Sequence, residues 1–134
     1  IGQSGLGASV FFEQETGTDQ VNPDGSTTIL TSFVQSFDFS LQANQSEIFL
    51  AMRRFLPNFK VLTGNNQVTI GVSDYPSDSV AATRLSPFTI DATTDKVDTR
   101  ARGRFVNIKI ENDSSSESWR FGTLRIDIQP DGRR

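Results

Sequence analysis

The sequence predicts an all-β protein: a single antiparallel domain built as a β-sandwich or a Greek-key barrel. Apolar and polar residues alternate over most segments, with the period of two that places side chains on opposite faces of a strand. Gly, Pro and Asn separate these segments at short intervals, and no segment has a convincing amphipathic helical pattern. The 134 residues suffice for one domain around one core.

The N-terminal half begins with a glycine-rich stretch. Residues 1–8 contain three glycines and are predicted to be a flexible lead-in to a β-sandwich-like domain over residues 9–129. The alternation over Ile29–Leu41 predicts one long strand, or two strands with a bulge. Ile48–Phe55 is apolar on both faces until two arginines, which leaves a strand or a helix open, and Pro57 is expected to end it.

The central segments predict a hairpin and a long connection. The turn residues Gly64–Asn66 lie between Lys60–Leu62 and the alternating Val68–Val72, so these two segments are expected to pair. Ser73–Pro87 is rich in Ser, Asp and Pro and is predicted to be a connection. A short strand is expected to follow it at Phe88–Asp91.

The last hairpin has the strongest local pattern. Thr99–Glu111 is predicted to pair with Trp119–Gln129 across the polar turn Asn112–Ser118. In the return strand the apolar residues change parity at Gly122, which predicts a β-bulge. Pro130 is expected to end this strand, which leaves residues 130–134 as a basic C-terminal tip.

Three arginines lead into this hairpin at alternate positions. They share parity with the apolar residues that follow, so all six are expected on one face of one long strand: Arg100, Arg102, Arg104, Val106, Ile108 and Ile110. Guanidiniums in a row need anionic or carbonyl partners, because an unpaired charge is not buried cheaply. Together with Arg120 and Arg125 on the expected partner strand, the three arginines are interpreted as a subunit interface. The alternative is that they bond within their own domain.

Charge is unevenly distributed along the chain. Residues 1–52 hold six acidic residues and no Lys or Arg, a formal charge of −6, whereas residues 53–134 hold all 13 cations against ten acidic residues, a charge of +3. The imbalance is either solvated, neutralised within the fold, or satisfied between copies. In the last case the acidic part of one copy meets the basic part of the next, as in head-to-tail rings.

The amino-acid composition also limits the kinds of catalytic site and metal site that the chain can form. The chain has no histidine and no cysteine, which removes the common nucleophile systems and zinc sites, so neither an enzyme nor a cofactor is predicted. Carboxylates such as Glu13, Glu15 and Asp91 leave a glycosidase-type acid and base as the one catalytic route. No apolar run is long enough for a membrane span. Overall acidity disfavours specific nucleic-acid binding.

Four segments carry a resemblance to a known group of proteins. Arg100–Glu111 contains an R-x-R-G-R strand, Trp119–Arg134 contains W-R-x-G and a basic end, and Phe11–Asp19 and Arg53–Phe59 add weaker similarity. In these motifs the chain resembles virion structural proteins of short-tailed bacteriophages, nearest in kind to tail nozzle or tail tubular proteins.

The resemblance implies a place in the virion tail. It implies a homo-oligomeric ring, six-fold around the channel through which DNA passes, in contact with neighbouring tail proteins. Nozzle proteins are far longer, so it also implies that this chain is a C-terminal portion, and the start at Ile1 agrees with a piece of a longer protein. A different class of function stays open, because a tryptophan on a β-sandwich can stack on sugars: Trp119 would then serve a carbohydrate- or receptor-binding module.

Overall fold

The protein is all-β. The computed structural model describes residues 2–5, 8–11, 17–41, 48–75 and 83–133, and no helix occurs among them. The strands of these residues are β1 (Gly2–Gly5), β2 (Ala8–Phe11), β3 (Asp19–Val21), β4 (Thr27–Ile29), β5 (Phe33–Gln35), β6 (Ile48–Thr63), β7 (Asn66–Ser73), β8 (Thr83–Ile90), β9 (Val97–Gly103), β10 (Phe105–Asn112) and β11 (Ser118–Arg133).

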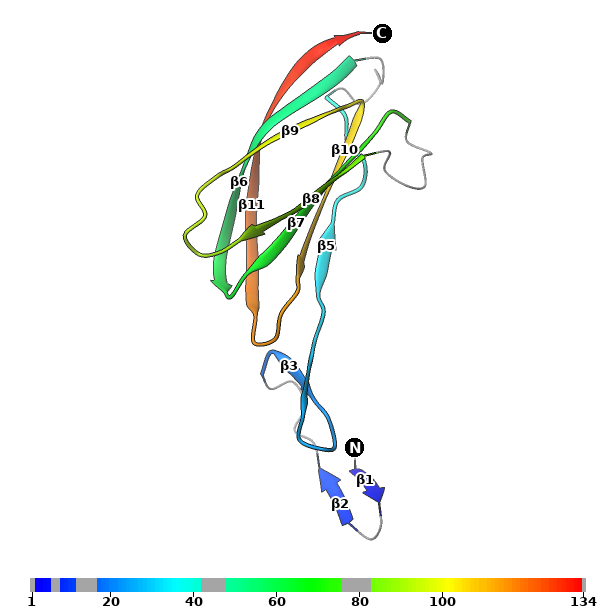
Figure 1. The fold of residues 1–134 in the computed structure, drawn as a ribbon, viewed down its shortest axis with the longest axis vertical. Coiled ribbons are helices and arrows are strands. Elements are labelled where there is room, and N and C mark those ends of the chain that lie inside the picture. Colours follow the sequence, from blue (N-terminus) through cyan, green and yellow to red (C-terminus); the bar gives the residue numbers. More distant parts are fainter. Residues whose placement is uncertain (1, 6–7, 12–16, 42–47, 76–82, 134) are drawn as a thin grey trace.

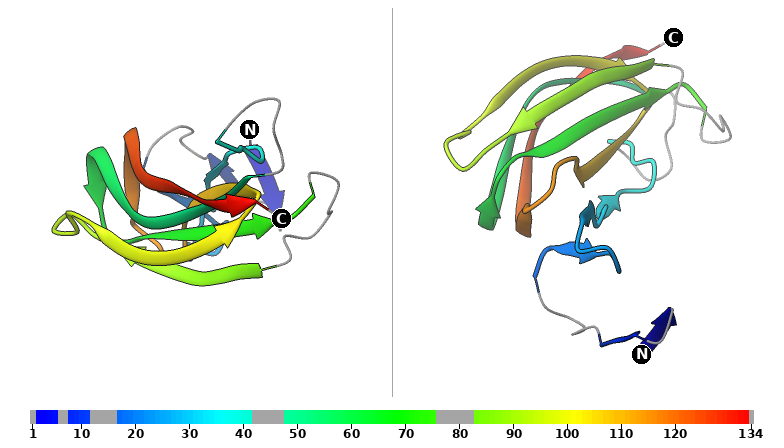
Figure 2. Two further views of the ribbon diagram at one scale, coloured as in Figure 1. Left: turned by 90° about the horizontal axis from the view of Figure 1, so that it is seen from above. Right: turned by 60° about the horizontal axis from the view of Figure 1, so that its bottom comes forward.

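Two antiparallel sheets form a β-sandwich, one of the two predicted architectures. The first sheet has the order β5-β10-β7-β8 and the second has the order β11-β6-β9. The sheets lie face to face (Figures 1 and 2). Two small hairpins, β1-β2 and β3-β4, lie beyond one end of the sandwich (Figure 1).

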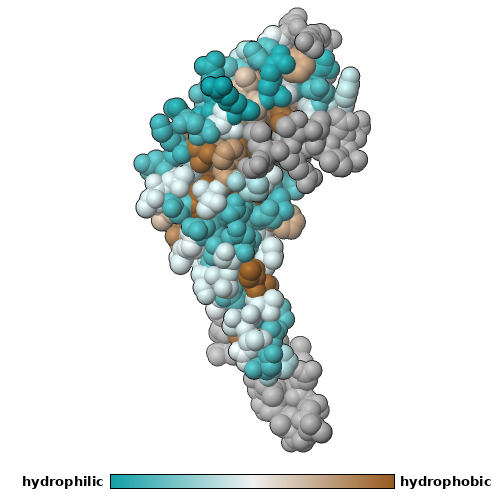
Figure 3. Space-filling model, viewed as in Figure 1, coloured by the Kyte–Doolittle hydropathy of each residue, from teal (hydrophilic) through white to brown (hydrophobic). Residues whose placement is uncertain are grey.

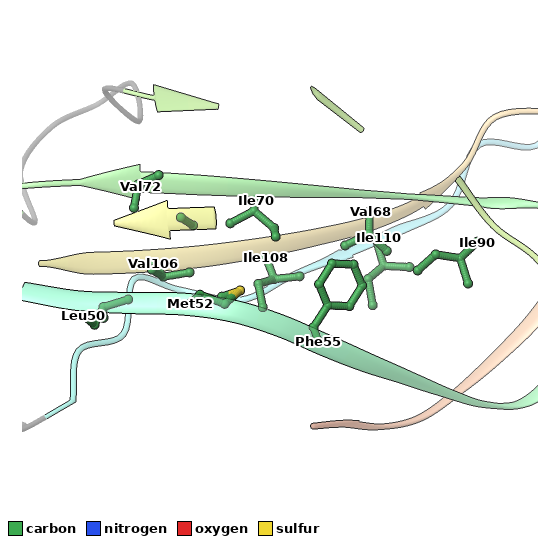
Figure 4. Packing of buried hydrophobic residues seen from close by; sticks show 11 residues of the cluster. Leu50, Met52, Phe55, Val68, Ile70, Val72, Ile90, Val106, Ile108 and Ile110 are labelled. Atoms are coloured by element: carbon green, nitrogen blue, oxygen red, sulfur yellow. The ribbon is translucent and has the colours of Figure 1, made fainter. Parts of the chain in front are cut away.

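The core fills the space between the sheets. Alternate residues of β10 point inward, so Val106, Ile108 and Ile110 are buried, and they meet buried residues from β6 and β7 (Figure 4). The buried cluster comprises Leu50, Met52, Phe55, Val68, Ile70, Val72, Ile90, Ala101, Val106, Ile108 and Ile110. Each large apolar side chain contributes about 1.5–3 kcal/mol on burial, so this cluster is the main stabilising element of the sandwich.

Turns occur at Gly64 and after Asn112, as predicted. The strands on the two sides of each turn do not pair with each other, however. β6 and β7 lie in different sheets, as do β10 and β11, so the two turns join one sheet to the other. The return strand β11 pairs instead with β6 along nearly its whole length, and β10 pairs with β7 and β5. The hairpin predictions were therefore wrong in their pairing, because a polar turn can join strands of one sheet or cross between two.

The expected long strand Thr99–Glu111 is two strands in two sheets. β9 ends at Gly103 in the second sheet, and β10 begins at Phe105 in the first sheet. At the corner the inward parity changes from odd to even numbers: Ala101 and Gly103 are buried in β9, and Val106 is buried in β10. Arginines and apolar residues therefore do not share one face.

Pro57 and Pro130 do not end strands as predicted, and Pro87 lies in a strand rather than in a connection. Pro57 lies inside β6, where β9 has stopped pairing after Phe55, so the strand has a neighbour on one side only. Pro87 lies inside the edge strand β8 beside a register shift, and Pro130 lies inside the edge strand β11. Edge positions tolerate a residue that lacks a backbone N–H. β8 accordingly starts at Thr83, within the stretch predicted as a connection, of which residues 76–82 lie outside the described residues.

Both segments that were predicted to flank the domain, residues 1–8 and residues 130–134, contain parts of strands. The lead-in expected over residues 1–8 contains β1, which pairs with β2, while residues 1, 6 and 7 lie outside the described part. At the other end β11 continues to Arg133. The expected basic tip therefore overlaps the end of a strand.

The alternating segment Ile29–Leu41 is not one continuous strand. It contains the end of β4, the three residues of β5 and a single bridge from Phe39 to Val106. Phe33 and Phe37 are exposed, whereas Phe39 packs against the core. Only some of the alternating apolar side chains of this segment are therefore buried.

Candidate subunit-interface face

Most of the predicted interface arginines lie on the outer face of the β11-β6-β9 sheet. Val61 pairs with Arg120, Leu56 pairs with Arg125 and Ala51 pairs with Arg102, and paired residues share a face. Arg100 is exposed with the same parity as Arg102. We call this surface the arginine face and define it by Arg53, Leu56, Val61, Arg100, Arg102, Arg120 and Arg125.

A bulge adds residues that the sequence interpretation left out. Met52 and Phe55 are buried, and the register of β6 shifts between them on both its neighbours. Arg53 and Arg54 therefore both lie toward the outer face, Arg53 exposed and Arg54 half-buried. The sequence does contain a sign of this bulge, because two adjacent arginines interrupt an otherwise apolar strand.

Arg102 has partners within its own chain. Its guanidinium forms an ion pair with the Asp131 carboxylate and donates to the Asp131 carbonyl oxygen at 3.3 Å. It also lies over the Phe49 ring, 4.4 Å from the ring centroid. The interpretation that arginines bond within their own domain therefore holds for Arg102.

Arg104 is also engaged within the chain, and it lies at the corner between the sheets rather than on the arginine face. Its guanidinium lies 5.2 Å from the Phe49 ring centroid and 5.9 Å from that of Tyr75. Phe49 is only 8% exposed although it neighbours the inward-facing Leu50, because the two arginines cover it. Arg104 thus protects an aromatic ring on the sheet surface.

One ion pair bridges two strands of the sheet. Arg54 Nε donates to Asp98 Oδ1 at 2.6 Å. This hydrogen bond is the main reason that the pKa of Asp98 lies below its ordinary value of 3.8. Asp98 is therefore a carboxylate at neutral pH, already held by its own chain.

The remaining arginines of the face have no ion pair with any residue that the structure describes: Arg53, Arg100, Arg120 and Arg125. Arg53 and Arg100 line a hollow of about 580 Å³, with Arg102, Asp98 and Asp131 at its sides. Beside these cations Leu56 is 37% exposed and Val61 is 48% exposed. The surface thus combines unpaired positive charge with apolar contact area.

Trp119 does not offer an open ring. Its Nε1 donates to Ser32 Oγ at 3.1 Å, and its ring meets Phe59 edge to face with centroids 6.3 Å apart. The residue is half-buried and packs against the core. This arrangement fixes the linker before β5 and leaves less of the ring for a sugar than the sequence suggested.

Comparison with known proteins does not place the chain in a family. No family model matches the chain, and no curated protein matches it significantly. In the described residues no group of three or more Asp, Glu, His or Cys could hold a metal ion, and no helix could cross a membrane.

Proposed function

We propose that this chain is a structural subunit of the tail of a short-tailed bacteriophage, assembled with copies of itself as a ring around the DNA channel. Its role is to form interfaces, with copies and with neighbouring tail proteins, and not to catalyse a reaction. The proposal rests on the motifs that resemble virion tail proteins. The observation that carries it is the arginine face, where four cations without a described ion partner lie beside exposed apolar side chains.

The chemistry of this face suits a protein interface. Arginine makes bidentate hydrogen bonds to carboxylates and strand carbonyls, and it is enriched where proteins meet. Leu56 and Val61 add apolar area between the cations. The outer face of the other sheet differs, because Lys109 there pairs with Glu111 at 2.6 Å in the same strand.

Self-association of the purified chain tests the proposal. Light scattering after size-exclusion chromatography is expected to show masses above the 14.8 kDa of one chain, increasing with concentration. Arg100→Glu should weaken this association by more than tenfold, because it places a carboxylate where an acidic partner is expected. The matched control is Lys96→Glu, a reversal on the exposed loop before β9, which should change association by less than about twofold.

Arg102 is a poorer probe than the sequence indicated. Its partner Asp131 belongs to the same chain, so Arg102→Ala would disturb the cover of Phe49 as well as any interface. A wild-type chain that stays monomeric at every concentration would contradict the proposed assembly.

A further inference from the structure

The β3-β4 hairpin has too little packing of its own to be stable alone. Each strand has three residues, and all residues from Pro23 to Gln35 are exposed. Val21 is 55% exposed and Ile29 is 37% exposed. An isolated two-stranded hairpin is marginally stable in water at best, so this one needs a surface to cover it.

Its own sandwich does not supply that surface. Asp19 Oδ2 accepts a hydrogen bond from the Ser116 backbone N at 2.7 Å, which ties one end of the hairpin to the β10-β11 turn. The rest of the hairpin lies beyond the end of the sandwich (Figure 1). Hydrophobic surface is exposed where the linker after β4 reaches the sandwich (Figure 3), in agreement with Leu30, which is 58% exposed.

The hairpin is acidic as well as apolar. It contains Asp19 and Asp24 and no Lys or Arg. Asp24 lies at its tip, and Oδ1 of this carboxylate accepts from the Ser26 backbone N at 2.9 Å and from the Ser26 hydroxyl at 2.5 Å. These bonds lower the pKa of Asp24 from its ordinary value, so the tip is charged at neutral pH.

We infer that the β3-β4 hairpin of one copy docks on the arginine face of the next copy. The acidic tip meets the guanidiniums of Arg53 and Arg100, which have no ion partner among the described residues, and the apolar residues Val21 and Ile29 cover the nearby Leu56. This inference rests on the proposed function, because it names the partner for which the face is built. The two surfaces differ, so the contact is head-to-tail, which closes as a ring or extends as a filament.

Complementation between two variants tests the inference. A face variant, Arg100→Glu with Arg125→Glu, keeps its hairpin. An arm variant, Val21→Lys with Asp24→Lys, keeps its face. Each variant alone should be monomeric by light scattering, with association at least tenfold weaker than wild type. An equimolar mixture holds one intact hairpin and one intact face, so it should form a 1:1 complex of twice the 14.8 kDa chain mass and nothing larger.

The controls separate docking from misfolding and from charge effects. Circular dichroism of each variant should match wild type. Asp95→Lys, a charge reversal in the exposed loop between β8 and β9, should assemble normally. Because the chain has no cysteine, a second measurement is available. A bismaleimide should join Pro23→Cys monomers to Gln129→Cys monomers, since both residues are exposed and Gln129 pairs with Ala51 beside the hollow. It should join Asp95→Cys to Gln129→Cys at less than a tenth of that yield.

The outcomes distinguish this inference from the proposed function. If wild type assembles but the mixture and the cross-linked pair stay monomeric, the hairpin is not the occupant, and the proposed function stands. The same conclusion follows if the arm variant assembles like wild type. If wild type never assembles, both are overturned.

Discussion

Glu117 joins the two turns that cross between the sheets. Its Oε1 accepts from the Asn65 backbone N, and its Oε2 accepts from the backbone N atoms of Asp113 and Ser114, each at 3.0 Å. The residue is 7% exposed, so these N–H groups would find little water in its place. One carboxylate therefore holds both crossings at the same end of the sandwich.

We expect Glu117→Ala to lower the free energy of unfolding by about 1.5–3 kcal/mol, the cost of hydrogen bonds to a charged group. Glu117→Gln should cost less, because an amide oxygen can still accept. Urea unfolding measures both. Ser115→Ala, in the same turn but exposed, is the control, and a Glu117→Ala chain as stable as this control would contradict the role given to the carboxylate.

The Arg54 to Asp98 pair predicts a pH dependence. The folded pKa of Asp98 is below its ordinary value of 3.8, so the pair contributes stability above about pH 4, and this contribution is lost as pH falls through the folded pKa. The difference in stability between wild type and Arg54→Gln should therefore shrink below pH 4. By NMR titration Arg54→Gln should raise the pKa of Asp98. It should leave that of Asp91 low, because hydrogen bonds from Thr93 and Thr94 lower it.

At the scale of elements, the corner between β9 and β10 decides where the arginines lie. A Cβ on Gly103 would lie 2.5 Å from Val72 Cγ1 and 3.3 Å from the Ser73 carbonyl oxygen. The Arg104 backbone N donates to the same Ser73 oxygen at 3.1 Å. The strand can thus pass close to β7 and enter the other sheet only because residue 103 has no side chain.

Gly103→Ala should cost about 1–3 kcal/mol, because the added methyl overpacks the corner. Val72→Ala removes the methyl group that it would meet. The double variant should therefore lose less stability than the sum of the single variants, by about 1 kcal/mol. Combining Gly103→Ala with Val68→Ala, four residues along the same strand, should give additive losses. If the losses of stability were additive for Val72→Ala as well as for Val68→Ala, the steric explanation would be wrong.

At the scale of the whole molecule, the structure separates the charges in space. The acidic hairpin lies beyond one end of the sandwich, and the arginine face lies on the outside of one sheet. Opposite charges held apart within one chain are available to attract another copy. An interface formed this way is screened by salt over a Debye length of about 8 Å at physiological ionic strength.

Self-association should therefore weaken as salt increases. Raising sodium chloride from about 50 mM to about 500 mM is expected to lower the association constant by at least tenfold, since several exposed or partly exposed charges are involved. The residual association of Arg100→Glu should respond less to salt than that of wild type. Sedimentation velocity at several salt concentrations measures both, and association that strengthens with salt would indicate an apolar interface.

Local patterns in the sequence correctly predicted the all-β class, the positions of the turns at Gly64 and after Asn112, and the bulge at Gly122. The bulge is confirmed: the register shifts around Phe121, and Phe121, Leu124 and Ile126 all pack against the core. These features are local, because the alternation of apolar and polar residues, and any change in it, can be recognised within a few consecutive residues.

The pairing of the strands and the partners of the arginines, in contrast, could not be predicted from the sequence. A turn does not encode whether the next strand stays in its sheet, so β6 and β11 pair although they are distant in the chain. Arg102 is paired because Asp131 arrives beside it across the sheet, and Arg100 has no such described neighbour. The partner of a charged side chain depends on the packing of distant segments, which no local pattern of residues contains.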